Sequence, residues 1–507
     1  MDAAARAARG LLILAIAGAA AADDFQNGAE SALAGRWEEA RAAFLKGQRA
    51  APRDKRFPLE LAGVEYRLKN FREAKRDLRR ALRLDPGDRY GNDFLGTIYF
   101  LEGNLEASLR YWNRIGKPRI ADVTVSPEPR VDPVLLDSAL TFSPASVLTA
   151  DELRTSEARL DALEVFPSYR FDLAAHPEES FDATIHWLQL PAWMEIASAF
   201  RGVPYQTVTP QVRNIGGSGI SADALLRWDA QKRRAGVSLA GPVHHNAQWR
   251  YGWYADGRSE TWSAGAPEDF RLRRLASGVE IQAIPNWRLQ WRMGAEVSSR
   301  HFANLPGFRG GTALEYRASI NYELLRIPEH RLTVSSGVTA SFGRMFSRTN
   351  NLYAQGQASL RARWLPQARG DDYEVNARLR AGTTQGGAPF DELFQVGVER
   401  DNNLWLRGHA GTIDGKKGSA PIGRNYVLAN WDLQKHLYRR GIFTLAGGPF
   451  LDTGRINDTF RRDRFGHWMV DTGLEASVRL AGAFRITLIY GRDLRGGGRV
   501  VYATAGQ

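Results

Sequence analysis

The strongest constraint on the fold is an alternation of apolar and polar residues that recurs through residues 203–507. Around residues 287–298, Trp291, Met293 and Val297 fall at odd positions, whereas Arg292 and Glu296 fall at even positions. A period of two residues is typical of β-strands with one apolar and one polar face. Many of these segments are long, and Trp and Tyr stand near their ends. Such strands are typical of a barrel that meets lipid outside and encloses a polar lumen.

We therefore predict that residues 203–507 form a transmembrane β-barrel of about 16 antiparallel strands, because bacterial barrels have even strand numbers. A closed barrel also satisfies every backbone hydrogen-bonding group within lipid. The alternative is a soluble β-sandwich, whose polar face would meet only water and whose strands are usually shorter.

The positive charge of the chain has a place in this barrel. The sequence carries 68 Lys and Arg against 56 Asp and Glu, a formal net charge of +12. Nucleic acid or anionic lipid could balance that charge. Many arginines, however, fall on the polar face of the strands, so we assign them to ion pairs in the lumen and expect no nucleic-acid partner. The lumen charges that we single out are Arg288, Arg292, Glu296, Arg317, Asp432, Asp471 and Glu475.

Residues 1–22 have the pattern of a secretory signal peptide. Arg6 and Arg9 precede a short apolar core, and small residues follow up to Ala22. The alternative is a buried N-terminal helix. The sequence has no Cys, which excludes disulfides, Cys-ligated zinc and thiol catalysis. We expect a protein of the bacterial outer membrane with its N-terminal domains in the periplasm.

Residues 24–118 repeat with a period of 34 residues and resemble the tetratricopeptide repeat, a helix pair of that length. Such arrays offer a concave groove to peptides or proteins, so we expect a periplasmic or inner-membrane partner protein here. A simple spacer is the alternative. The aligned large residues, which we predict to line the groove, are Trp37, Phe44, Phe71, Leu78 and Trp112.

Residues 119–195 predict a small α/β module. The pattern is a strand, two helices and two strands, and a capping-box signal at Thr149 and Glu152 opens the second helix. This order resembles the polypeptide-transport-associated (POTRA) domain, including the run Leu-Asp-Ala-Leu-Glu-Val-Phe at residues 160–166. In that family an exposed sheet edge can bind client strands by strand addition.

A long polar segment from about Arg400 to Gly423 interrupts the alternation. Long loops of this kind are more often functional than passive. In the segment that follows, Asp452 shares its parity with the polar positions, so we predict that it points into the lumen. Arg407 could fold back and bind it through two hydrogen bonds, with Gly408 allowing close backbone packing. The alternative is that Arg407 is a solvated loop residue.

From about residue 119 onward the chain resembles the bacterial surface-antigen family, which comprises barrel-assembly factors, translocation and assembly module proteins, and two-partner-secretion transporters. That family carries a Val-Arg-Gly-Phe/Tyr motif in its sixth extracellular loop and a Phe-x-Asp-x-Gly motif in the next hairpin. The counterparts here are Leu406, Arg407, Gly408 and His409, and Phe450, Asp452 and Gly454. His409 departs from the aromatic residue, and Leu406 departs from the valine.

The resemblance implies an outer-membrane protein that inserts or translocates client polypeptides, with a periplasmic arm that receives clients or partners. A barrel-anchored scaffold, or a passive pore, is the alternative. The sequence lacks the Gly-x-Ser-x-Gly, Walker and His-Glu-x-x-His motifs, and arginines neighbour the lumen carboxylates. We therefore expect no enzymatic activity, no cofactor and no metal site; the adjacent His244 and His245 would point to opposite faces of a strand.

Overall fold

The computed structural model describes residues 21–176, 180–189, 191–263, 268–305, 308, 310–346, 351–440, 442–458, 466–480 and 484–506. The chain divides into two compact units. One comprises Met1–Ala121, Ala145–Ala150 and Ala175–Phe181, and the other comprises Asp122–Pro144, Asp151–Ala174 and Asp182–Gln507. The predicted signal peptide lies almost wholly outside the described residues. The domain boundaries expected from the sequence remain predictions.

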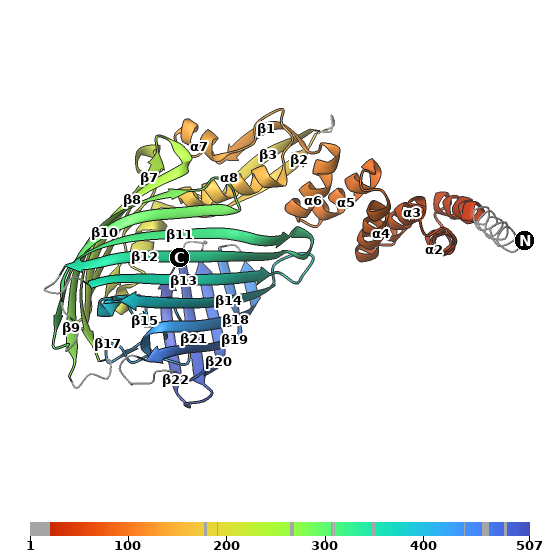
Figure 1. Cartoon of the computed structure of the whole chain (residues 1–507). Coiled ribbons are helices and arrows are strands. Elements are labelled where there is room, and N and C mark those ends of the chain that lie inside the picture. Colours follow the sequence, from red (N-terminus) through yellow and green to blue (C-terminus); the bar gives the residue numbers. More distant parts are fainter. Residues whose placement is uncertain are drawn as a thin grey trace, which may run out of the picture. The chain divides into compact units, whose positions relative to one another are not determined.

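The first unit is a helical repeat, red to orange in Figure 1. Its helices are α2 (Trp37–Ala50), α3 (Arg56–Arg67), α4 (Phe71–Leu84), α5 (Arg89–Leu101) and α6 (Leu105–Trp112), followed by the 3-10 turn η1 (Asn113–Ile115). Because α2, α4 and α6 begin at Trp37, Phe71 and Leu105, the helices repeat with the predicted period. The more specific assignment to the tetratricopeptide repeat stays a prediction.

The predicted groove residues need a correction. Phe44 and Leu78 have no exposed surface, and Trp112 is 3% exposed. The indole ring of Trp112 packs so closely on Gly96 that a β-carbon there would collide with it. Large residues recur at the repeat period because they fill the gaps between neighbouring helices. These three residues therefore form the core of the repeat; Trp37 and Phe71 are partly exposed.

The predicted α/β module has the expected order of elements. It contains β1 (Arg119–Ser126), α7 (Pro133–Ala139), α8 (Ala150–Leu163), β2 (Tyr169–Ala175) and β3 (Ser180–Trp187). The strands form a sheet in the order β1-β3-β2. Leu135 of α7, Leu160 and Leu163 of α8 and Ile185 of β3 share one buried cluster, which fixes the helices on the sheet.

The remainder of the second unit is a closed barrel of antiparallel strands (Figure 1). The helix α9 (Ala192–Ala199) and the turn η2 (Val203–Tyr205) precede it, and η3 (Ile215–Gly217) and η4 (Pro328–His330) lie between strands. The strands are β4 (Thr207–Val208), β5 (Gln211–Val212), β6 (Ser221–Trp228), β7 (Lys232–Val243), β8 (Asn246–Trp262), β9 (Phe270–Ala283), β10 (Leu289–Ala303), β11 (Gly311–Ile327), β12 (Leu332–Phe346), β13 (Asn351–Trp364), β14 (Tyr373–Gly386), β18 (Ile422–Arg440), β19 (Phe443–Asp458), β20 (Met469–Leu480), β21 (Phe484–Asp493) and β22 (Arg499–Gly506).

The described part of the barrel contains fourteen strands of eight residues or more. The short strands β4 and β5 both pair with β6. The predicted number of about 16 strands stays a prediction. His244 and His245 both have positive φ angles and form the turn between β7 and β8, so they do not lie on a strand.

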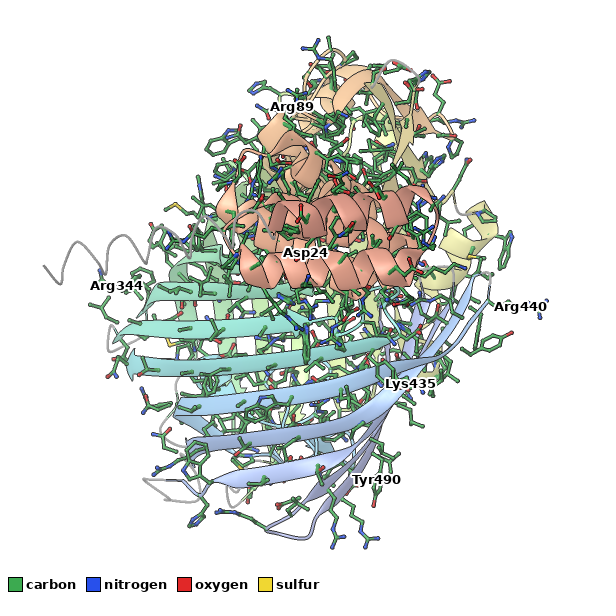
Figure 2. All side chains as sticks on the ribbon, turned by 90° about the vertical axis from the view of Figure 1, so that its right-hand side faces the viewer. Asp24, Arg89, Arg344, Lys435, Arg440 and Tyr490 are labelled. Atoms are coloured by element: carbon green, nitrogen blue, oxygen red, sulfur yellow. The ribbon has the colours of Figure 1, made fainter. Side chains whose placement is uncertain are left out.

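The two faces of the barrel strands differ as the alternation predicts. On β10, Met293 and Val297 are more than half exposed, whereas Glu296 and Arg300 are buried. Tyr490 of β21 likewise projects from the outer face in Figure 2. The apolar side chains therefore lie outside, and the charged ones line the interior. None of the helices in the described part of the chain is long and apolar enough to cross a bilayer.

Candidate functional site: a loop inside the barrel

Residues 387–421, which we call the inner loop, connect β14 to β18. They contain the turn η5 (Phe390–Glu392) and the short strands β15 (Phe394–Gln395), β16 (Thr412–Ile413) and β17 (Lys416–Lys417). Connections usually run over the protein surface, yet Val396, Glu399, Leu406 and Arg407 are all at most 4% exposed. Arg407 and Glu399 have their ion-pair partners on barrel strands: Asp452 of β19 and Lys232 of β7. The inner loop is therefore folded into the barrel interior.

Arg407 binds Asp452 of β19 through a two-point contact. Its Nε donates to Oδ2 of Asp452 at 2.8 Å, and its Nη2 donates to Oδ1 at 2.6 Å. The backbone N–H of Arg407 also donates to Oδ2 at 3.0 Å. Asp452 has no exposed surface. Paired, parallel hydrogen bonds of this kind fix direction as well as distance, so the predicted pair is confirmed as a contact.

Two more carboxylates and an aromatic ring surround the same guanidinium. Its Nη1 donates to Asp432 of β18 and, at 3.1 Å, to Oε2 of Glu475 of β20. Its Cζ lies 3.8 Å from the centroid of the Phe450 ring, which is cation–π geometry. The predicted residues Phe450, Asp432 and Glu475 thus gather around Arg407 from three neighbouring strands.

An apolar cluster holds the chain next to Arg407. Leu404 and Leu406 of the inner loop pack with Phe394, Val396, Tyr426, Leu428 and Ile456. Leu406 has no exposed surface, and a β-carbon on Gly454 would lie 3.4 Å from its Cδ1. The leucine that replaces valine at this position is therefore accommodated by packing against the wall.

Gly408 lies where a side chain has no room. A β-carbon there would be 2.6 Å from the backbone nitrogen of Asp493 and 2.7 Å from Cγ of Asp471, and real β-carbons do not come so close. Opposite it, a β-carbon on Gly491 would overlap the carbonyl oxygen of Arg407. The two glycines let the loop backbone approach β21 directly.

His409 lies between two carboxylates of the wall. Its Nδ1 is 3.1 Å from Oδ2 of Asp471 on β20, and its Nε2 is 3.5 Å from Oδ2 of Asp493 on β21. The backbone N–H of Gly408 donates to the same Oδ2 of Asp471 at 2.6 Å. The imidazole of His409 thus makes polar contacts with β20 and β21 that a phenylalanine ring could not make.

A second set of ion pairs, which we call the second anchor, holds the start of the inner loop on β8, β9 and β10, whereas Arg407 is held by β18, β19 and β20. Asp391 accepts hydrogen bonds from Nε of Arg300 on β10 at 2.9 and 3.0 Å, and from Nη2 of Arg258 on β8 at 3.2 Å. Arg274 of β9 is 3.5 Å away. Glu392 accepts from Arg300 as well. Three neighbouring strands therefore present arginines to two acidic loop residues.

The middle of the inner loop contacts the first long strands. Asp401 accepts from Arg227 of β6 at 2.7 Å and from Arg234 of β7 at 2.9 Å. Lys232 of β7 lies 3.4 Å from Glu399. Acidic residues of the described loop thus pair with basic residues of β6–β10, and Arg407 and His409 face carboxylates of β18–β21. The division by charge is not complete, because Lys417 of the loop pairs with Glu260 of β8 at 2.8 Å.

Of the other predicted lumen charges, Glu296, Arg317 and Arg292 make polar contacts on the barrel strands, whereas Arg288 does not lie on a strand. Glu296 accepts from Tyr254 at 2.8 Å and from Arg274. Arg317 donates to Glu315 at 2.6 Å, and Arg292 lies 3.5 Å from Glu280. Arg288 needs a correction.

Arg288 belongs to the connection between β9 and β10, outside both strands, and is exposed. Its guanidinium lies over the ring of Trp287, at 4.7 Å from the centroid. The alternation was extended one residue too far at this strand end, so Arg288 does not belong with the lumen ion pairs.

Sequence reasoning missed the anchor of Asp391 and the contacts of Asp401. A signal was present, because Arg258, Arg274 and Arg300 all fall on the inward face of their strands. The positions of Asp391 and Asp401 could not be found in this way, because the inner loop has no period that assigns its side chains to a face.

Neither a family model nor a curated protein matches the sequence. Among solved structures, CdiB from Escherichia coli matches with 11% sequence identity over 77% of this chain and 77% of that chain, at a TM-score of 0.50. CdiB from Acinetobacter baumannii matches with 10% identity over 76% and 73%, at 0.45. BamA from Haemophilus ducreyi lacking POTRA domains 1-3 matches with 10% identity over 77% and 84%, at 0.45. At 11% identity, the similarity to CdiB from Escherichia coli shows a shared barrel fold and no more.

Proposed function

We propose that this protein is a bacterial outer-membrane protein that inserts or translocates other polypeptides. Three findings support the proposal: an apolar exterior on the barrel, a charged interior, and a fold shared with CdiB from Escherichia coli. A charged interior suits a water-filled or plugged lumen, and an apolar exterior suits lipid. In this proposal the barrel has about 16 strands and follows one POTRA-like module.

The observation that carries the proposal is the way in which the inner loop is held. Arg407 contacts carboxylates of β18, β19 and β20, and Asp391 contacts arginines of β8, β9 and β10. A passive pore has no need of a loop bound to both sides of its lumen. The loop is held by these ion pairs and by the apolar cluster around Leu406, and the charged groups can exchange their partners for water when the loop moves. We therefore assign to Arg407 and Asp452 the role of holding a movable plug.

The N-terminal regions would form a periplasmic arm for clients or partners. The sheet order β1-β3-β2 leaves β1 and β2 as edge strands, and an edge can add an incoming extended chain through main-chain hydrogen bonds. The helical repeat would bind a periplasmic or inner-membrane protein. Crosslinking from the exposed residue Tyr90 of α5, followed by identification of the captured proteins, tests this part of the proposal.

The alternative is a barrel that anchors the repeat and transports nothing. The decisive experiment is complementation of a deletion strain with Arg407→Ala and Asp452→Ala, read out as the abundance of other outer-membrane and secreted proteins. We expect both variants to insert into the membrane and to lose complementation, whereas Arg440→Ala, at the end of β18, retains it. Full complementation by both variants would reject the assigned role. A deletion strain with an unchanged outer-membrane and secreted proteome would favour the anchor.

A further inference from the structure

We propose that His409, Asp471 and Asp493 form a binding site for a divalent cation of the Zn²⁺ class at the tip of the inner loop. The site goes beyond the proposed transport function, because it does not depend on what the barrel carries. One ligand atom from each of the three residues lies within 4.8 Å of the other two. Ligand bonds of about 2.0–2.2 Å are usual for zinc with imidazole and carboxylate, so a small contraction of this triad would enclose an ion.

The burial of Asp471 supplies an independent observation. Its side chain has no exposed surface, and its Oδ2 accepts a hydrogen bond from the Gly408 N–H. Its Oδ1 is also buried, but has no hydrogen-bond partner within the described residues. A buried carboxylate oxygen without a partner carries a desolvation cost. A cation bound beside it would offset that cost.

The local charge favours a divalent cation over a proton on His409. Asp452, Asp471 and Asp493 are register neighbours on β19, β20 and β21, so three carboxylates stand in one row. Arg407 forms an ion pair with Asp452. The carboxylates of Asp471 and Asp493 both face His409. A proton on the imidazole would offset one negative charge and give the free Oδ1 no partner. A divalent cation would offset both charges.

The donor set also defines the class of ion. Imidazole nitrogen suits Zn²⁺ and its first-row neighbours, whereas Ca²⁺ and Mg²⁺ prefer ligands that are all oxygen. Three protein ligands leave a further position for water. The absence of a metal site expected from the sequence is not tested by the structure, and no local motif links His409 to Asp471, which is 62 residues away. The ion would tie the loop tip to β20 and β21, next to the contact of Arg407 with β19.

The test uses the full chain, purified in detergent and stripped of metal with a chelator. Zn²⁺ binding is measured by calorimetry and by metal content, and Co²⁺ provides a ligand-field absorption spectrum. We expect one tight site, which His409→Gln weakens by about tenfold or more. His330→Gln, which replaces a histidine of η4, serves as the matched control and should leave binding unchanged. Heat-modifiable gel migration verifies that each variant forms a barrel.

Two outcomes would overturn the proposal. In one, the native chain binds no Zn²⁺ at neutral pH, which would leave His409 as an ion-paired imidazole only. In the other, His409→Gln binds Zn²⁺ as tightly as the His330→Gln control, which would place the ion elsewhere. Asp493→Asn gives a second check, because it leaves the Arg407 contacts in place; its affinity should fall together with that of His409→Gln. Calorimetry and metal content do not depend on transport activity. A failure of the metal site can therefore be distinguished from a failure of the proposed transport function.

Discussion

Arg407 donates to both carboxylate oxygens of Asp452: Nη2 donates to Oδ1, which also accepts from Asn430, and Nε and the backbone N–H donate to Oδ2. Arg407 and Asp452 are 45 positions apart, and both are buried. Removal of one member of a buried ion pair costs about 3–5 kcal/mol, because the other charge remains without a partner. This contact therefore contributes to fixing the position of the loop tip.

Arg407→Lys should release the loop tip although the charge is kept. A lysine has a single ammonium group and cannot reproduce the two parallel hydrogen bonds to Asp452. We expect faster proteolysis within the inner loop and a higher single-channel conductance in planar bilayers. Arg440→Lys, at the end of the same β18, should change neither quantity. If the Arg407→Lys loop is as resistant to protease as that of the native chain, charge alone holds the loop.

Gly408→Ala should displace the loop tip without a change of charge. The added β-carbon would fall within 2.7 Å of both the Asp493 nitrogen and the Asp471 Cγ, so the backbone must move. We expect increased hydrogen exchange in residues 404–410 and in the facing part of β21. Gly356→Ala on β13 is the matched control, since its nearest neighbour would be 4.0 Å away. Equal exchange in the two variants would show that the loop tip is not packed against β21.

The second anchor predicts that the two ends of the inner loop loosen separately. Asp391→Asn removes the charge that faces Arg258, Arg274 and Arg300, so exchange should rise around residues 389–395. The region of Arg407 should stay protected, because the two anchors share no partner in the described structure. Effects of substitutions without shared partners usually add to within about 0.5 kcal/mol. Whether the two effects add is measured by the single-channel conductance of the Asp391→Asn/Arg407→Ala double variant. If its conductance is no higher than that of either single variant, the inner loop moves as one body.

The sequence predicted the inward direction of Asp452 because a strand has a fixed period of two. It could not predict that Asp432 and Glu475 would meet the same guanidinium. Strand register decides which inward residues face each other, and register depends on hairpin connections that have no sequence period. The contacts of Asp391 and Asp401 depend in addition on the path of an aperiodic loop. The odd or even position of a residue along a strand assigns it to a face of the barrel, but it does not identify the residue that it contacts.

The helical repeat shows the complementary limitation. The helices α2, α4 and α6 recur with the predicted period, but that period did not separate core from surface, and Phe44, Leu78 and Trp112 were assigned to a groove. A repeat records the positions that every unit needs, and these are chiefly packing positions. Residues that recognise a partner have no reason to recur in each unit, so the repeat pattern alone cannot find them.

Asp77 makes the stability of the helical repeat dependent on pH. It lies on α4, is 6% exposed, and its burial raises the pKa of the carboxyl group to about 6. Protonation is easier in the folded state than in the unfolded one, where an Asp has a pKa of about 3.9. The protonated carboxyl group of Asp77 therefore makes its full contribution to the stability of the folded repeat below pH ~4, and this contribution is lost as the pH rises through about 6.

Asp77→Asn should remove this dependence and stabilise the repeat at neutral pH by about 2–3 kcal/mol, since one pKa unit corresponds to about 1.4 kcal/mol. The measurement is hydrogen exchange of the α4 amides in the full chain at pH 5 and pH 8, corrected for intrinsic rates. The native chain should show weaker protection at pH 8, and Asp77→Asn should show equal protection at both. Glu38→Gln, on the exposed face of α2, should behave like the native chain. Stronger protection of the native α4 at pH 8 than at pH 5 would contradict the assignment, because it would mean that the ionised carboxylate stabilises the folded repeat.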